Sequence, residues 1–104
     1  MKAKEHYFEG LQRLSRDDFE GAIEAFQSAI GEDDEFFLGY LGCSQALDKL
    51  GKVDEAILQA KKAVDIVPDE PLVHTSLSRL LQQKGLIAEA EGEMALSHRL
   101  QSRV

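Results

Sequence analysis

A period of 34 residues organises this chain. The segments 18–30, 52–64 and 86–98 align without a gap, and each has an apolar residue, alanine three positions later, and another apolar residue four positions after that. These residues are Phe19, Ala22 and Phe26, then Val53, Ala56 and Ala60, then Ile87, Ala90 and Met94. Such offsets lie on one face of a helix. The spacing predicts three equivalent helices, whose small alanines let a second helix approach closely.

A partner helix is expected upstream of the second and third segments. Apolar residues recur there at helical spacing, namely Tyr40, Cys43, Leu47 and Leu50, then His74, Leu77 and Leu81. This spacing forms a single stripe along a helix. Gly51 and Gly85 follow the two stripes at the same offset, where one helix ends and the chain must turn back. The repeating unit is therefore predicted to be a helical hairpin.

The pattern resembles the tetratricopeptide repeat, in which an aromatic residue, Leu-Gly, another large residue, alanine, a large residue and proline recur in order. The matching residues are Tyr40, Cys43, Ser44, Leu47, Ala56, Ala60 and Pro68, then His74, Leu77, Ser78, Leu81, Ala90 and Met94. The resemblance implies an all-α fold, a right-handed superhelical solenoid of three antiparallel helical hairpins. We expect one domain over residues 1–104, with repeats at about 3–36, 37–70 and 71–104. The polar outer face of its last helix predicts that the array ends there and that the chain is nearly complete.

The first unit departs from the pattern at two places. A strict 34-residue spacing puts Glu9 and Arg13 on the packed stripe, whereas deleting one residue from the turn at 15–18 aligns Tyr7, Gly10, Leu11 and Leu14 with it. We favour the deletion, because burying an unpaired Glu and Arg costs several kcal/mol and shortening an exposed turn costs little. Asp34 stands where Pro68 stands one unit later, so Gly31 is expected to end the helix.

The charge, the cysteine content and the lack of a long apolar run exclude several classes of function. The chain has 19 acidic and 12 basic residues, a formal net charge of −7 and an isoelectric point near 4.9. This balance argues against a nucleic-acid partner, since phosphate backbones attract basic surfaces. The single cysteine, Cys43, permits neither an internal disulfide nor a zinc framework and indicates a reducing, cytoplasmic compartment. No apolar run approaches the length of a membrane helix, so no membrane insertion is expected.

No constellation of catalytic or metal-binding residues is recognisable. The three histidines are widely separated, and His74 falls in the column of Tyr7 and Tyr40, which predicts a half-buried packing residue. Cys43 lies on the packed stripe and is expected to be an inert thiol. The acidic run 32–35 lacks the ligand pattern of a calcium loop. We expect no enzyme activity, no cofactor and no metal.

The resemblance implies a concave face lined by the first helix of every unit. Projecting these helices gives the candidate peptide-binding residues Phe8, Gln12, Leu38, Leu41, Gln45, Asp48, Leu72, Thr75, Arg79 and Gln82. An apolar anchor is expected beside Leu38 and Leu41, with Gln12, Gln45 and Arg79 bonding a backbone or an acidic side chain. The alternative is that Leu38 and Leu41 only pack within the solenoid.

Some relatives that serve chaperones hold a terminal carboxylate with lysines, asparagines and an arginine on this face. The matching places here are Phe8, Gln12, Gly42, Leu72 and Ser76, or Tyr7 and Leu11 in the other register of the first unit. Neither set makes such a clamp, so binding of EEVD-type tails is not expected.

The leading hypothesis is a noncatalytic module that binds a peptide or amphipathic helix of another protein in its concave groove. The alternatives are a self-assembling scaffold, such as a homodimer, and a small chaperone that resembles those of bacterial secretion systems.

Overall fold

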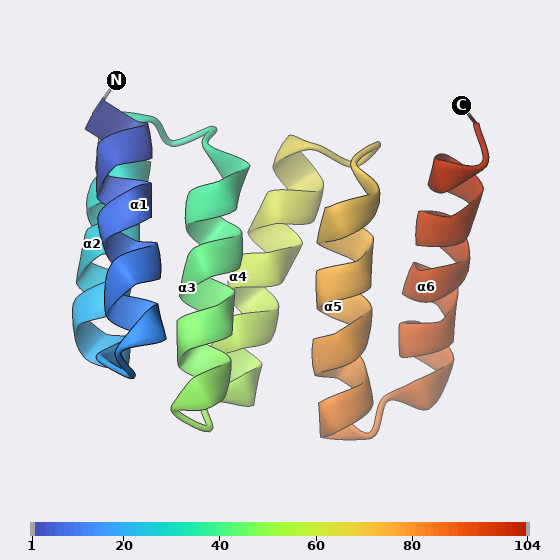
Figure 1. The fold of residues 1–104 in the computed structure, drawn as a ribbon. Coiled ribbons are helices and arrows are strands. Elements are labelled where there is room, and N and C mark those ends of the chain that lie inside the picture. Colours follow the sequence, from blue (N-terminus) through green and yellow to red (C-terminus); the bar gives the residue numbers. More distant parts are fainter. Residues whose placement is uncertain (1, 104) are drawn as a thin grey trace.

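The computed structural model describes residues 2–103, so Met1 and Val104 of the predicted domain lie outside it. Six helices form three antiparallel hairpins, and no strand is present in this range. The hairpins are α1 (Lys2–Ser15) with α2 (Phe19–Glu32), α3 (Phe37–Lys49) with α4 (Val53–Ile66), and α5 (Pro71–Lys84) with α6 (Ile87–Gln101). Figure 1 shows them side by side in chain order. The predicted all-α solenoid of helical hairpins is confirmed.

The turn inside each hairpin has the same backbone conformation. A residue with positive φ occupies each turn, and the next amide donates to a carbonyl five residues back at 2.9 Å. The positive-φ residues are Asp17 (62°), Gly51 (80°) and Gly85 (88°), and the bonds join Asp18 to Arg13, Lys52 to Leu47 and Leu86 to Leu81. Glycine takes this left-handed conformation without strain. The predicted role of Gly51 and Gly85 is confirmed.

The shortened turn predicted for the first hairpin is wrong, although α1 does pack into the core through the residues predicted for it. These residues are Tyr7, Gly10, Leu11 and Leu14. The bond from Asp18 to Arg13 spans the same five residues as its two equivalents, so the first turn has lost no residue. Glu9 and Arg13 lie at the first edge of the array instead of in the core, with side chains 49% and 41% exposed. The Arg13 guanidinium pairs with Glu9 at 2.9 Å and with Asp18 at 3.2 Å. The burial cost that favoured a deletion therefore does not arise.

The end of α2 also differs from the expectation. The helix continues through Gly31 to Glu32, and Asp33 ends it with an extended backbone at φ −150°. The Asp33 side chain then accepts the Glu35 amide at 3.0 Å, which shapes the connection to α3. An aspartate turn thus does here what proline does after α4.

The core of the first two hairpins is built around Phe26 of α2. Its ring is fully buried between Gly10 of α1 and Gly42 of α3. A Cβ atom would lie 2.4 Å from the ring at Gly10 and 2.6 Å at Gly42, so both positions need glycine. Ala22, fully buried in the same cluster, gives α2 the close approach expected from the repeat. Tyr7, Leu11 and Leu14 pack against this cluster from α1.

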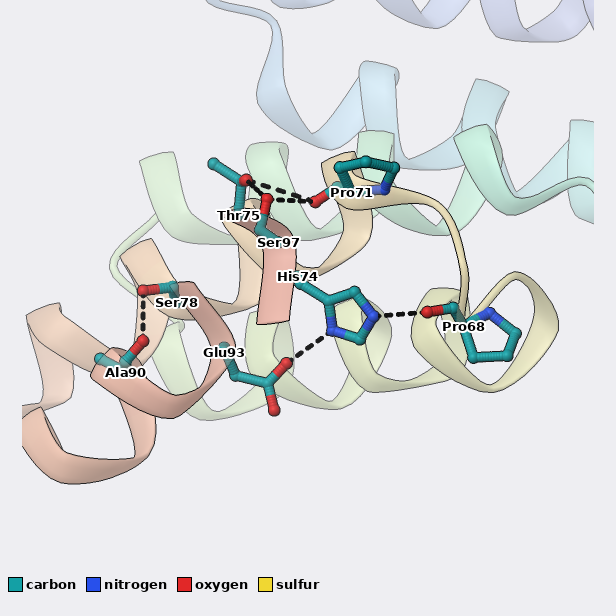
Figure 2. Close-up of polar contacts among 8 residues, drawn as sticks. All are labelled: Pro68, Pro71, His74, Thr75, Ser78, Ala90, Glu93 and Ser97. Carbon is teal, nitrogen blue, oxygen red and sulfur yellow. Dashed lines mark hydrogen bonds and ion pairs between the residues drawn. The ribbon is translucent and has the colours of Figure 1, made fainter. Parts of the chain in front are cut away.

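The contact between α5 and α6 is more polar than its equivalents. Within residues 2–103, α6 lies close to α5 and to no other helix, and its fully buried residues are Ala90 and Ser97. His74 of α5 is 2% exposed instead of half-buried, because both of its ring nitrogens have hydrogen-bond partners. Figure 2 shows this ring between Pro68 and Glu93.

Candidate functional site

A cavity of about 180 Å³ opens on the surface formed by the first helices of the three hairpins. Its lining residues all come from α1, α3 and α5, and they are Tyr7, Leu38, Leu41, Gly42, Ser44, Gln45, Leu72, Ser76 and Arg79. The structure thus brings together five of the predicted residues, namely Leu38, Leu41, Gln45, Leu72 and Arg79. We call this site the first-helix cavity.

Leucines form the apolar part of the first-helix cavity. Leu41 is 7% exposed and packs with Ala63 and Val73, so it belongs to the core and serves as the floor. The alternative interpretation, packing within the solenoid, therefore holds for Leu41. Leu72, by contrast, is 47% exposed, and Leu38 is half-buried. Leu72 and Leu38 are thus the apolar side chains that a bound molecule would contact.

The polar part of the cavity contains one basic group. Arg79 is exposed, and within residues 2–103 no carboxylate lies within 4.0 Å of its guanidinium. Gln45 is exposed beside it on α3. The Ser44 hydroxyl donates to the Leu41 carbonyl at 2.7 Å, so it is engaged within its own helix. Arg79 and Gln45 can therefore bond to a ligand without breaking an existing side-chain contact.

Two predicted residues of α1 lie elsewhere because of the register. Phe8 and Gln12 line a separate depression of about 710 Å³ that is otherwise formed by charged residues of α1 and the first turn. Tyr7 takes the place in the first-helix cavity that Phe8 was expected to fill. One residue corresponds to about 100° around a helix, so an error of one position moves a side chain to another face. A strict spacing of 34 residues, without a deletion in the first turn, places Tyr7 in the column of Leu41 and would have predicted Tyr7 in the cavity.

Three further predicted residues lie outside the first-helix cavity. Asp48 accepts a hydrogen bond from the Gln83 side chain at 3.2 Å. Thr75 bonds to Ser97 at 2.8 Å and so points toward α6. Gln82 is exposed and does not line the cavity.

The positions that match the carboxylate clamp of some tetratricopeptide repeat proteins hold no basic residue here. Gly42, Leu72 and Ser76 line the first-helix cavity at these places, and Tyr7 lines it from α1. Leu11, which matches a clamp position in the other register of the first unit, packs in the core. Arg79 is the one basic residue of the lining, so the cavity offers a single charge to an acidic ligand.

Cys43 is buried away from this surface. Its side chain is 2% exposed, and burial raises the pKa of the thiol to about 11. The reactive thiolate is therefore scarce near neutral pH. Across residues 2–103, no cluster of three His, Cys, Asp or Glu side chains is placed to hold a metal ion. In the same range, no helix has the length and apolar character to cross a membrane.

Comparisons with known proteins agree with the repeat pattern. A family model described as tetratricopeptide repeat matches residues 13–80. The protein STIP1 homolog of Dictyostelium discoideum is 31% identical over 91 residues, which is 88% of this chain and 16% of that protein. The chain thus spans about a sixth of the length of this relative.

Two solved structures show how closely the fold is shared. The yeast Sti1 TPR2B domain, solved as a complex with pHsp70, has a TM-score of 0.94 and 25% identity over all of this chain and 83% of that one. The Yersinia enterocolitica secretion chaperone SycD, in complex with a peptide of the translocator YopD, has a TM-score of 0.86 and 25% identity over 93% of this chain and 74% of that one.

Proposed function

The chain belongs to the tetratricopeptide repeat family, and from this membership we propose that it is a noncatalytic module that binds an extended segment of another protein in the first-helix cavity. The observation that carries the proposal is the pairing of exposed Leu72 with uncommitted Arg79 in one cavity. The solved structures of the Sti1 TPR2B domain in complex with pHsp70 and of SycD with a YopD peptide support a segment of another protein as the ligand class.

The chemistry of the cavity favours an apolar side chain next to an acidic one. Leu72 and Leu38 accept the apolar group, since removing their exposed surface from water is favourable. The Arg79 guanidinium donates two parallel hydrogen bonds to a carboxylate, and the Gln45 amide bonds to the peptide backbone. A terminal carboxylate alone is a poor ligand because one cation cannot replace a clamp of several. Internal acidic-apolar segments are therefore the proposed ligands.

A peptide-display selection on the wild-type protein tests this proposal. Selected decapeptides are expected to carry an apolar residue near an aspartate or glutamate. Calorimetry with the best peptide then compares Leu72→Glu and Arg79→Glu with two controls outside the cavity, Leu58→Glu on α4 and Arg99→Glu on α6. We expect each cavity variant to lose at least tenfold in affinity, about 1.4 kcal/mol, and each control to bind like the wild type. If all four variants bind the peptide as tightly as the wild type, the first-helix cavity is rejected as the binding site.

A homo-oligomer is the second candidate, favoured by apolar exposure on the second helices. Leu58 of α4 is 60% exposed and Ile87 of α6 is 51% exposed. Leu58 also lines a depression of about 300 Å³, together with Leu81 of α5 and Leu86, the residue before α6. Sedimentation over a hundredfold concentration range distinguishes the candidates. Self-association that Leu58→Glu abolishes would support an oligomer, and a monomer at every concentration would remove it.

A further inference from the structure

Ser76 of α5 is a buried serine whose hydroxyl forms no hydrogen bond within residues 2–103. Its side chain is 9% exposed and lines the first-helix cavity. The other buried polar side chains all bond to protein atoms, and they are Ser44, His74, Ser78 and Ser97. In the same range, no side-chain nitrogen or oxygen that is closed off from solvent lacks a partner, so the Ser76 oxygen is reached from the cavity. A molecule in the cavity can therefore accept a hydrogen bond from it.

The cavity is lined by equivalent positions of α3 and α5. Three pairs recur at the interval of 34 residues, namely Leu38 with Leu72, Gly42 with Ser76, and Gln45 with Arg79. Because α3 and α5 lie side by side, each pair forms a row that crosses both helices (Figure 1). We call these pairs the leucine row, the small row and the polar row. The small row lies between the other two.

The small row lets the backbone of a ligand come close to the helices. Gly42 has no side chain and Ser76 has a short one, whereas the rows on both sides carry long side chains. Leu72 and Arg79 are seven positions apart, which is about 10.5 Å along a helix. A β-strand with side chains on both faces needs about 10 Å, the spacing of stacked sheets. An extended strand that lies along the small row therefore fits between the leucine row and the polar row.

The chemistry of the three rows also matches an extended strand. Successive side chains of a strand point to opposite faces, so they reach the leucine row and the polar row in turn. The backbone carbonyls point at right angles to the side chains, and every second one faces the small row. On the basis of the proposed function, we propose that the ligand crosses α3 and α5 as an extended strand of alternating apolar and acidic residues, and that one of its carbonyls accepts a hydrogen bond from Ser76.

Two helices set the length of the recognised segment. Packed helices lie about 8–10 Å apart, and a strand rises about 3.4 Å per residue, so about four residues span α3 and α5. The small row does not continue to α1, where Phe8 stands 34 residues before Gly42. The recognised segment is therefore a short alternating sequence. A helical ligand would instead place its apolar residues three or four positions apart.

Two peptides of the same composition test the alternation. Both are glycine-serine decapeptides with four central residues, either leucine and glutamate in alternation or two leucines followed by two glutamates. The alternating peptide places both leucines on one face of a strand and both glutamates on the other, and its isomer does not. Nuclear magnetic resonance titration of the wild-type protein should give at least tenfold tighter binding of the alternating peptide. Equal affinities, or no measurable binding of the alternating peptide, would overturn the strand.

Two serine variants test the hydrogen bond to the ligand. Ser76→Ala removes the unpaired hydroxyl and should weaken binding of the alternating peptide about three- to tenfold, the effect of one hydrogen bond. Ser44→Ala is the matched control, because Ser44 lines the same cavity but its hydroxyl donates to the Leu41 carbonyl. This control should bind like the wild type, and circular dichroism checks that both variants keep the fold. Wild-type affinity in Ser76→Ala, or an equal loss in both variants, would overturn the hydrogen bond.

Arg79→Glu distinguishes a failure of the strand from a failure of the binding site. If the two peptides bind equally and Arg79→Glu weakens both at least tenfold, the ligand occupies the first-helix cavity in another conformation and the strand is wrong. If Arg79→Glu leaves the binding of both peptides unchanged, the first-helix cavity is not their binding site and the proposed function fails as well.

Discussion

Replacing Gly42 with alanine tests how the core is built around Phe26. The added Cβ would meet three atoms of the Phe26 ring at 2.6, 2.7 and 2.8 Å. Carbon atoms normally pack at about 3.5–4.0 Å, so the ring would have to move by about 1 Å. It has no free side to move toward, because a Cβ at Gly10, on the opposite helix, would lie 2.4 Å from the same ring.

The expected cost of Gly42→Ala is about 1–3 kcal/mol from overpacking, reduced by the roughly 1 kcal/mol that alanine gains over glycine in a helix. Gly92→Ala is the matched control, since no atom lies within 4 Å of its added Cβ, and it should be stabilised by about 0.5–1 kcal/mol. Urea unfolding followed by circular dichroism measures both.

A double variant identifies the cause of the loss. Phe26→Leu makes room for the new methyl group, so Gly42→Ala should cost less in that background, with a coupling of about 0.5–3 kcal/mol. The reasoning is refuted if Gly42→Ala is as stable as Gly92→Ala, or if the two changes in the core add without coupling.

Two other predictions follow from the turns and the buried thiol. Asp17→Gly should stabilise the fold by about 0.5–1 kcal/mol in urea unfolding, because glycine adopts the positive φ that Asp17 holds at 62°; no gain would mean that the aspartate is unstrained. Cys43, with its pKa raised to about 11, remains a thiol up to pH 9, so iodoacetamide should modify it much more slowly in the native protein than in urea; equal rates would contradict its burial.

The sequence was sufficient to predict the packing of the second helices and the turns of the second and third hairpins. Ala22, Ala56 and Ala90 recur at a constant interval, and each is fully buried against a neighbouring helix. Gly51 and Gly85 recur in the same way because the left-handed backbone of the turn favours glycine. Where one residue type suits one backbone or packing requirement, periodicity alone identifies it.

The register of α1 could not be predicted from burial costs alone. Glu9 and Arg13 occupy packed positions of the repeat, but their edge of the array leaves them exposed and paired. That error moved Phe8 and Gln12 into the predicted site and left Tyr7 out of it. The edge of an array follows different rules from its interior, because the neighbour that makes a position apolar is missing.

The environment of His74 was missed for a different reason. Its column in the repeat pattern indicates packing, whereas its chemistry depends on Glu93, which lies 19 residues away and meets it only when α6 folds back. The departure from tyrosine at 74 and the glutamate in place of Gln59 were each visible, but nothing in the sequence joins them.

Nuclear magnetic resonance titration with a selected acidic-apolar peptide tests the central claim most directly. If the peptide occupies the first-helix cavity, the largest amide shifts should fall on the α3 and α5 residues that line it, around Gln45, Leu72 and Arg79. The shifts should be much smaller in Arg79→Glu at the same peptide concentration, because this variant is expected to bind at least tenfold more weakly. Shifts that instead cluster on α2, α4 and α6, and that survive Arg79→Glu, would contradict the account.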